Sequence, residues 1–302
     1  MMRKKVLTEA SGSLVSGYLL KAIKDAGHIA VASDIDEQCV GRYLADEFVK
    51  MPSKHAPDLW VIVSAILAEN RIDVVIPSLD ETLLGWAENK HRFAAQGVEV
   101  IISDPSVIET FVDKWLAYRF FVENGIPTPD SSLNQDYPLV KPRNGRGGQG
   151  VCVTSEPVDM NGMLSQELLE GEEYTVDVLC DKASRPLYIV PRRRIGVKDG
   201  KSTQGIVVNH AEIVKVVNAL CQATQFVGPI NVQCFCCNDG TVKVVEVNPR
   251  IAGGMALGFA ATENWVAVLC NKLTGETLYR AKPINYGLRM LRYYAEVFVS
   301  EH

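Results

Sequence analysis

The sequence predicts an α/β protein that changes to an α+β arrangement in its C-terminal part. Over residues 5–102, strand-like and helix-like segments alternate, which is typical of a parallel sheet covered by helices on both faces. Further on, two strand-like runs flank Asp239 and Gly240, and this dipeptide is a strong signal for an antiparallel hairpin. The two patterns predict at least two structural units.

The N-terminal unit is predicted to be Rossmann-like. Residues 5–8 and 28–33 are expected as strands, joined by a glycine-containing turn and a helix that ends at Gly27. The turn lacks the G-x-G-x-x-G spacing of a dinucleotide site, so a scaffold is favoured over dinucleotide binding. Further segments follow the same alternation: a helix over 60–70, a strand over 72–77, a helix from 78 and a strand over 98–102.

Composition limits the classes of function. The chain of 302 residues has a net charge of −5, which provides no basic footprint for nucleic acid or for an anionic membrane surface. No apolar run is long enough to cross a bilayer, and the N-terminus enters a strand without a secretory hydrophobic region. We therefore expect a cytoplasmic protein with neither nucleic acid nor membrane as a partner.

A polar patch is predicted on the C-terminal hairpin. A two-residue turn at Asp239 and Gly240 places Gln233 opposite Glu246, and period-2 alternation places Asn248 on the same face. Oxygen-bearing side chains from both strands then converge, and hard cations such as magnesium prefer oxygen ligands. The alternative is an ordinary solvated strand face. Strict alternation also puts Val242 and Val244 on the face of Glu246 and Asn248, with Arg250 just beyond as a fixed cation.

Two further segments could contact phosphate. Residues 143–150 hold four glycines and two arginines between two predicted strands, so backbone N–H groups can approach phosphate oxygens. No G-K-[ST] opens a helix there, so this is not a Walker loop, and a flexible surface hairpin is the alternative. Arg192 and Arg194 share one face of a basic strand, either at a solvated edge or beside a phosphate.

Several motifs occur together in one order along the chain. They are Asp113-Lys114, residues 125–129, Leu139-Val140-Lys141 with the glycine-rich loop, residues 166–177, Gln233 and residues 246–250. Together they resemble the ATP-grasp superfamily. The likeness is greatest to one synthetase half of the carbamoyl phosphate synthase large chain, with biotin carboxylase more distant. It covers nearly the whole chain and is strongest over 113–254.

The resemblance implies an ATP-grasp fold in three parts. Residues 1–110 would form the pre-ATP-grasp Rossmann-like domain, 111–168 the lid, and 169–302 the C-terminal domain with a magnesium site. ATP and Mg²⁺ (or Mn²⁺) would lie between the last two parts.

The resemblance also assigns roles to single residues. The catalytic set would be Arg250, facing the acceptor oxyanion, with Asn248 and Lys141. The magnesium ligands would be Gln233, Glu246 and Asn248. The nucleotide would be held at its phosphates by Lys114 and Lys141, under a closing loop of Gly145, Gly147, Gly148, Gln149 and Gly150, at adenine by Gln166, Glu167 and Leu168, and at ribose by Glu173, with Arg194 nearby.

Two departures from the carbamoyl phosphate synthase pattern bear on the substrate. That family carries a further arginine after Asn-Pro-Arg, where this chain has residues 251–254, Ile-Ala-Gly-Gly, and residues 192–198 stand in place of its histidine-containing loop. The motifs also occur only once, whereas a carbamoyl phosphate synthase needs two phosphorylation units. Bicarbonate is therefore not favoured as the substrate.

Three functions remain open from the sequence. The first is an ATP-dependent ligase that joins a small carboxylate to an amine or thiol through an acyl phosphate and releases ADP and phosphate. The second is a kinase of bicarbonate or carbamate, similar to carbamoyl phosphate synthase, that works with a partner chain. The third is an ATP-binding module without turnover. The oligomeric state stays open, with a homodimer among the options.

Overall fold

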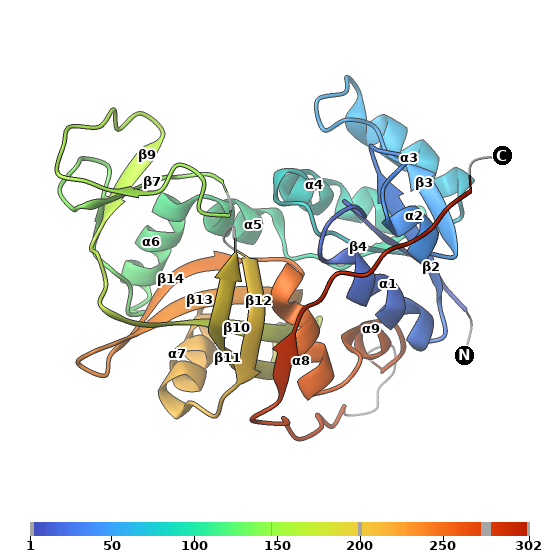
Figure 1. Cartoon of the computed structure of the whole chain (residues 1–302). Helices are drawn as coiled ribbons and strands as arrows, with labels where there is room; N and C mark the ends of the chain where they lie inside the picture. Colours follow the sequence, from blue (N-terminus) through green and yellow to red (C-terminus); the bar gives the residue numbers. More distant parts are fainter. Residues whose placement is uncertain (1–2, 146, 199–200, 273–278, 301–302) are drawn as a thin grey trace.

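The computed structural model describes residues 3–145, 147–198, 201–272 and 279–300. A Rossmann-like unit is built from the first part of the chain, and a large antiparallel sheet with its helices from the last part (Figure 1). A small four-stranded sheet stands above the end of the large sheet, at the upper left of Figure 1.

The N-terminal sheet is parallel throughout, as the sequence predicts. Its strands lie in the order β3-β2-β1-β4-β5, and each neighbouring pair is parallel. β3 has no counterpart among the strands predicted from the sequence. The strands are β1 (Lys5–Thr8), β2 (Ile29–Asp34), β3 (Glu47–Lys50), β4 (Val74–Ile76) and β5 (Glu99–Val100).

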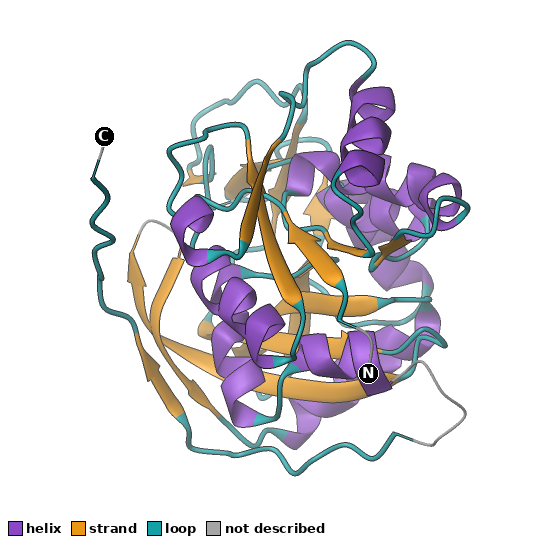
Figure 2. Cartoon of the chain, turned by 90° about the vertical axis from the view of Figure 1, so that its right-hand side faces the viewer, coloured by secondary structure: helices purple, strands orange, loops and turns teal. Residues whose placement is uncertain are grey.

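Helices cover both faces of this sheet (Figure 2) because the central strands are apolar on both sides. On β1, Val6 belongs to the core beneath α1, whereas Leu7 belongs to the core beneath α3 and α4. The helical segments are α1 (Ser16–Asp25), α2 (Gly41–Leu44), α3 (Leu59–Glu69), the 3-10 turn η1 (Asp80–Thr82) and α4 (Leu83–Ala94).

Two helices then lead to the small sheet. The carboxylate of Asp113 caps α6 (Lys114–Glu123) by accepting from the N–H groups of Trp115 and Leu116. Helix α5 (Pro105–Val112) precedes it, and both pack in the core beneath the large sheet. The small sheet, in the order β6-β9-β7-β8, comprises β6 (Ser131–Ser132), β7 (Leu139–Pro142), β8 (Cys152–Val153) and β9 (Met163–Gln166).

The large sheet has the order β14-β13-β10-β11-β12-β15, with every neighbouring pair antiparallel. Its strands are β10 (Gly171–Cys180), β11 (Pro186–Lys198), β12 (Lys201–Val207), β13 (Gly228–Cys237), β14 (Val242–Asn248) and β15 (Arg289–Leu291). The remaining helical segments are α7 (Ala211–Ala223), η2 (Gly253–Met255), α8 (Ala256–Ala261), α9 (Trp265–Ala267) and the π-helical η3 (Val268–Lys272).

The turn of the C-terminal hairpin differs in length from the predicted turn. Its turn is three residues long rather than two, because Cys237 accepts from the N–H of Gly240, and Gly240 has a φ of +86°. An irregularity then moves the register between the pairs Gln233–Glu246 and Cys234–Val244, which leaves Val245 as an extra residue on β14. The two shifts cancel, so Gln233 still lies opposite Glu246, as predicted.

The same irregularity overturns the predicted alternation on β14. Val242, Val244 and Val247 all lie in the core shared with α7, so the strand changes face at the extra residue. Glu246 is therefore on the opposite face from Val242 and Val244, not on the same face as expected. The inserted residue thus turns the polar end of the strand away from the helices and toward the small sheet.

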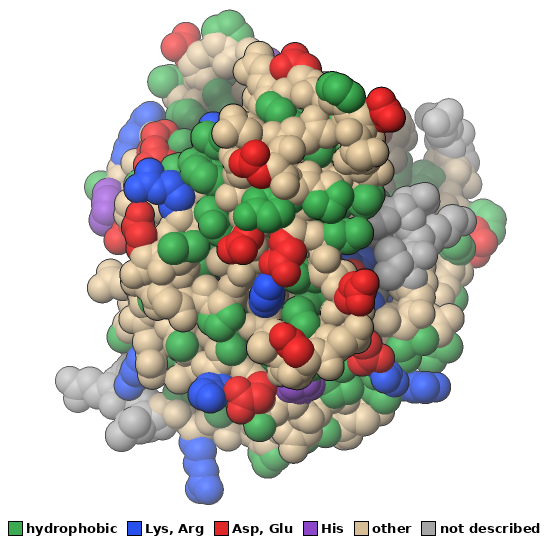
Figure 3. Space-filling view, turned by 90° about the vertical axis from the view of Figure 1, so that its left-hand side faces the viewer, with side chains coloured by type: hydrophobic (Ala, Val, Ile, Leu, Met, Phe, Trp, Pro, Cys, Tyr) green, Lys and Arg blue, Asp and Glu red, His purple; other side chains and the backbone are tan. Residues whose placement is uncertain are grey.

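None of the helices in the described residues is both long enough and apolar enough to cross a membrane. The face that carries the small sheet shows acidic and basic side chains interspersed with hydrophobic ones (Figure 3). No single-sign patch dominates the part of this face that the structure describes.

Candidate active site

The predicted magnesium residues lie together where the end of β14 pairs with the middle of β13. Gln233 and Glu246 are direct cross-strand neighbours, and Asn248 pairs with Asn231 two residues further along. Within the described residues, no hydrogen bond or short ion pair engages the side chains of Gln233 or Glu246. The two amides and the carboxylate offer hard oxygen donors, which magnesium prefers. The set carries one negative charge, so a magnesium ion bound there would remain net positive and could also bind a nucleotide.

Lys141 faces this patch from the small sheet. It lies on β7, is 5% exposed, and donates to Oε1 of Gln166 at 2.8 Å. Burial lowers the pKa of Lys141 to about 8, while the carboxylate of Glu246 opposes that shift and Lys114 adds to it. Glu246 and Lys114, which are far apart in the sequence, therefore both act on the ammonium group of Lys141.

Lys114 and the glycine-rich loop are also brought together. The ammonium group of Lys114, at the start of α6, donates to the carbonyl of Gly145 at 2.9 Å. The backbone of Lys114 donates to the carbonyl of Arg143, whose guanidinium pairs with Asp113 at 2.6 Å. The root of the loop is thus tied to α6, whereas Gly147, Gly148, Gln149 and Gly150 are exposed. Arg146 lies outside the described residues.

The predicted adenine residues differ in their surroundings. Gln166 is 4% exposed, and its amide bridges Lys141 and the hydroxyl of Ser131 at 2.9 Å. Its side chain thus positions Lys141 from within the small sheet. Glu167 pairs with Lys243 at 2.7 Å, and Leu168 is exposed. Their backbone and the exposed Leu168 face could still contact a base, so this assignment stays a prediction.

The two arginines of the basic strand have different environments. Arg194 pairs with Glu173 at 2.6 Å, so the predicted ribose residue and the predicted phosphate residue are partners. Arg192 is 1% exposed and pairs with the equally buried Asp177, where Nη2 lies 2.7 Å from Oδ1. The solvated-edge alternative is therefore wrong for Arg192. β11 runs inside the sheet, because β10 pairs with one of its edges and β12 with the other.

Small residues after the Asn-Pro-Arg motif make room for that buried pair. A Cβ atom on Gly254 would lie 3.0 Å from Nη2 of Arg192, and one on Gly258 would lie 2.8 Å from Oδ2 of Asp177. The amide of Asn231 also donates to Asp177 at 2.8 Å. The guanidinium of Arg192 thus reaches the turn that follows Asn-Pro-Arg from β11.

Arg250 contacts Asp80, a residue outside the predicted site. Its Nε and Nη2 atoms donate to the two carboxylate oxygens of Asp80, at 2.6 and 2.8 Å, in a bidentate ion pair. Nη2 also donates to Oδ1 of Asn248 at 3.1 Å. Asp80 belongs to η1 in the N-terminal unit, so this contact joins that unit to the magnesium patch. The sequence carried no signal for it, because 170 positions separate the partners.

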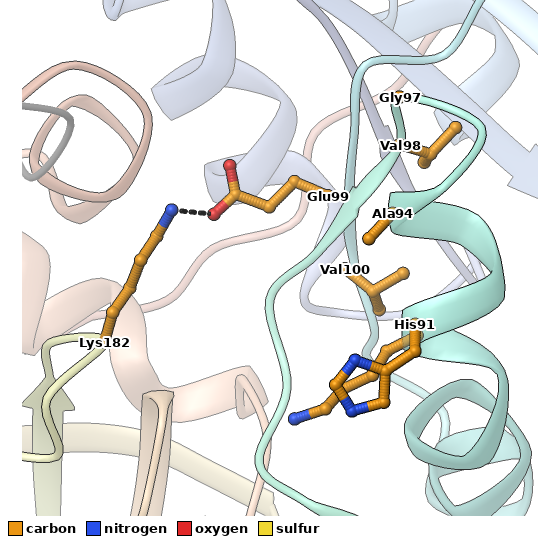
Figure 4. Close-up of a pocket in the computed structure, with 8 residues that line it drawn as sticks. His91, Ala94, Gly97, Val98, Glu99, Val100 and Lys182 are labelled. Carbon is orange, nitrogen blue, oxygen red and sulfur yellow. Dashed lines mark ion pairs between the residues drawn. The ribbon is translucent and has the colours of Figure 1, made fainter.

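A shallow pocket at the junction of the units is not part of this site. It has a volume of about 330 Å³ and is lined by residues of α4, β5 and the β10–β11 turn (Figure 4). Lys182 and Glu99 close one side of it with an ion pair of 2.5 Å. None of the predicted nucleotide or magnesium residues lines it.

The structure has an ATP-grasp fold with a Rossmann-like domain in front. Two family models match parts of the chain. Residues 159–294 match the ATP-grasp family described as "ATP-grasp in the biosynthetic pathway with Ter operon", and residues 11–101 match the family "PylC-like, N-terminal domain". The first match identifies an ATP-grasp domain over residues 159–294, as the motifs predict.

Known proteins agree with this assignment. The chain is 25% identical over 277 aligned residues to the carbamoyl phosphate synthase large chain of Ralstonia nicotianae, an alignment that covers 75% of this chain and 26% of that protein. Among solved structures, N5-carboxyaminoimidazole synthetase from Staphylococcus aureus with ADP has a TM-score of 0.75 at 15% identity, covering 97% of this chain and 83% of that one. The L-amino acid ligase from Bacillus licheniformis has a TM-score of 0.71 at 17% identity, covering 91% and 75%.

The chain spans about a quarter of the length of that curated relative. At such identities the solved structures establish the fold, and the substrates follow only from the site itself.

Proposed function

We propose that this protein is an ADP-forming ligase that joins a small carboxylate to an amine through an acyl phosphate. The observation that carries the proposal is the arrangement of Lys141 and Glu246 across one site, between the small sheet and the polar face of the large sheet. Phosphoryl transfer needs alignment and charge neutralisation more than covalent help from the protein. Two lysines opposite a carboxylate-bearing patch supply both.

The predicted residues divide the work. Lys114 and Lys141 bind the phosphates, and the loop at Gly145–Gly150 closes over them. Residues 166–168 line the base, and Glu173, with Arg194 as its partner, faces the ribose. Gln233, Glu246 and Asn248 would hold magnesium, which would supply charge neutralisation for phosphoryl transfer. Manganese could replace it.

The reaction has two steps, phosphorylation of the carboxylate and attack by the amine. A carboxylate oxygen of the substrate attacks the γ-phosphorus of ATP, and the bond to ADP breaks with its electron pair on ADP. The amine nitrogen then attacks the carbonyl carbon of the acyl phosphate, phosphate leaves with the C–O electron pair, and the nitrogen releases a proton. Arg250 lies beside Asn248. Its guanidinium can bind the oxyanion of the acceptor substrate once one of its two hydrogen bonds to Asp80 is broken. Water would hydrolyse the acyl phosphate, and the closing loop would exclude water from the site.

ADP release measured with pairs of substrates tests the proposal. Small carboxylates, including amino acids and bicarbonate, are screened with and without amines in the presence of MgATP. The proposal expects ADP and phosphate only when a carboxylate and an amine are both present. Release with bicarbonate alone would favour a kinase of small carboxylates, and ATP binding without release under every pair would indicate a module without turnover. Either result would overturn the ligase.

The boundaries at residues 110 and 168, the cytoplasmic location and a homodimeric state remain predictions. The small sheet spans 131–166, whereas helix α6 packs with the large sheet, so a protease-resistant fragment ending near residue 130 would move the lid boundary.

A further inference from the structure

A cavity in the N-terminal unit has no role in the proposed chemistry so far. It has a volume of about 400 Å³ and opens at the carboxyl ends of β1, β2 and β3, beside the starts of α3 and α4. Ligands of open parallel sheets bind at this edge, where loops leave successive strands. The loop from β1 enters the cavity with strained backbone, since Ala10 has a φ of +47°.

The walls of the cavity are apolar and held firmly. Trp60 and Trp86 line it and pack edge to face with their centroids 5.1 Å apart. The ring of Trp60 lies so close to Gly85 that a Cβ atom there would approach it to 2.0 Å. Ile35 and Met51 add aliphatic surface near the sheet. The cavity is therefore preformed for an apolar or aromatic group.

A buried carboxylate lies in one wall. Glu9 is 7% exposed and accepts from the indole of Trp86 at 2.7 Å, the hydroxyl of Thr82 at 2.9 Å and the backbone N–H of Ser78 at 3.2 Å. Burial raises the pKa of Glu9, and these hydrogen bonds oppose the shift by stabilising the charged form. No lysine, arginine or histidine in the described part of the chain forms an ion pair with Glu9.

The other charged groups around the cavity leave it acidic. Asp34 and Glu81 line it as well, opposed by Lys54, which pairs with Glu81 at 3.5 Å, and by His55 at the rim. Three carboxylates therefore face one lysine and one histidine. A cation inside would supply the charge that Glu9 lacks, whereas an anion would be repelled.

The cavity is connected to the active site through η1. Leu79, Glu81 and Thr82 line the cavity, and Asp80, between them, holds Arg250 in the bidentate pair. A ligand in the cavity thus contacts the same short turn that positions Arg250.

We propose that this cavity binds an organic cation, an ammonium group on an apolar or aromatic body, as one substrate of the enzyme. The inference deepens the proposed function, because it takes the ligase reaction as given and defines the class of one substrate. The ammonium group belongs either to the amine substrate, which must release a proton before its nitrogen attacks, or to the carboxylate substrate, and steady-state kinetics distinguish the two by which KM depends on the cavity.

Binding to the full chain without nucleotide tests the cavity by itself. The probes are 2-phenylethylamine, which is a cation at pH 7, 2-phenylethanol and phenylacetate, each titrated calorimetrically. The amine is expected to bind at least about tenfold more tightly than the alcohol, and phenylacetate more weakly still. Equal binding of the amine and the alcohol, tighter binding of phenylacetate, or binding of none would overturn the proposal.

Two surface variants locate the site without touching the core. Ile35→Arg places a cation at the mouth of the cavity, where Ile35 is 63% exposed, and should weaken amine binding about tenfold. Val61→Arg is the matched control, because Val61 is 57% exposed on α3 and does not line the cavity. Glu9→Gln should weaken binding further, with its fold checked by thermal melting. Equal amine affinity in Ile35→Arg and Val61→Arg would refute the assignment even if Glu9→Gln fails to fold.

ADP release separates this proposal from the ligase. If the amine binds as described but no substrate pair yields ADP, the cation-binding proposal is supported and the ligase proposal is wrong. If ADP is released and Ile35→Arg changes neither substrate KM relative to Val61→Arg, the ligase stands and the cavity proposal fails.

Discussion

Lys141 links the stability of the protein to its affinity for nucleotide. In the folded chain Lys141 is 5% exposed, and burial lowers the pKa of its ammonium group to about 8, against 10.5 for an ordinary lysine. A lowered lysine pKa means that folding disfavours the charged form. The difference costs the folded state about 3 kcal/mol below pH 8, and this cost disappears as the pH rises from 8 to 10.5. The phosphates of ATP would offset it on binding.

Replacing this lysine should therefore raise stability while it abolishes nucleotide binding. Lys141→Met removes the buried charge but leaves Oε1 of Gln166 without its donor, which costs about 1–2 kcal/mol. A net gain of about 1–2 kcal/mol in unfolding free energy is expected at pH 7, measured by urea denaturation without nucleotide. Lys114→Met is the matched control, because Lys114 is less buried and its ammonium group donates to a backbone carbonyl, that of Gly145. It should weaken ATP binding without a gain in stability.

The same pKa predicts how ATP affinity depends on pH. If the phosphates require the charged lysine, the Kd of the wild-type protein for MgATP should rise about twofold at pH 8 and about tenfold at pH 9. Lys141→Arg keeps the charge at every pH, so its Kd should stay level over that range. Calorimetric titration at pH 7, 8 and 9 measures both. A wild-type Kd that does not change between pH 7 and 9, or a less stable Lys141→Met variant, would refute this reasoning.

Four further predictions address the rest of the site. Glu246→Gln should lower the rate of ADP release at least about a hundredfold with little change in melting temperature, because it removes the one carboxylate from the magnesium patch; near wild-type release would exclude that role. Arg250→Lys should raise the KM for the carboxylate and leave the ATP Kd unchanged, since lysine cannot reproduce the fork that now holds Asp80; the opposite pattern would assign Arg250 to the nucleotide. Asp177→Asn should destabilise the fold by about 3–5 kcal/mol in urea denaturation, because it leaves a buried guanidinium unpaired; a loss below 1 kcal/mol would contradict the buried charge. Hydrogen exchange over residues 147–151 should slow when MgATP is added, and equal exchange would count against a closing loop.

The sequence predicted the fold class because its signals are local. Alternating elements indicated the parallel sheet, and the Asp239-Gly240 dipeptide indicated the hairpin. The pairing of Gln233 with Glu246 was also correct, although two compensating one-residue shifts produced it. Neither shift was visible in the sequence, because the extra residue at Val245 depends on contacts of β14 with residues 127 and 128 on its other edge.

What the sequence could not predict are pairs made across the fold. The partner of Arg250 is Asp80, in another unit, and the partner of Arg192 is Asp177, on the adjacent strand. Arg192 had the pattern of a surface residue because its neighbours in the sequence are also basic. The cavity beside Glu9 is lined from five separate segments, so no single motif marks it.

Isotope transfer tests the central claim most directly. A carboxylate substrate found by the ADP screen is labelled with ¹⁸O in both carboxylate oxygens and turned over with MgATP and the amine. If an acyl phosphate forms, one labelled oxygen moves from the carboxylate to each phosphate released, and mass spectrometry of the phosphate shows a single ¹⁸O. Phosphate that carries no label, released at the same rate as the amide, would contradict the acyl phosphate and with it this account of the site.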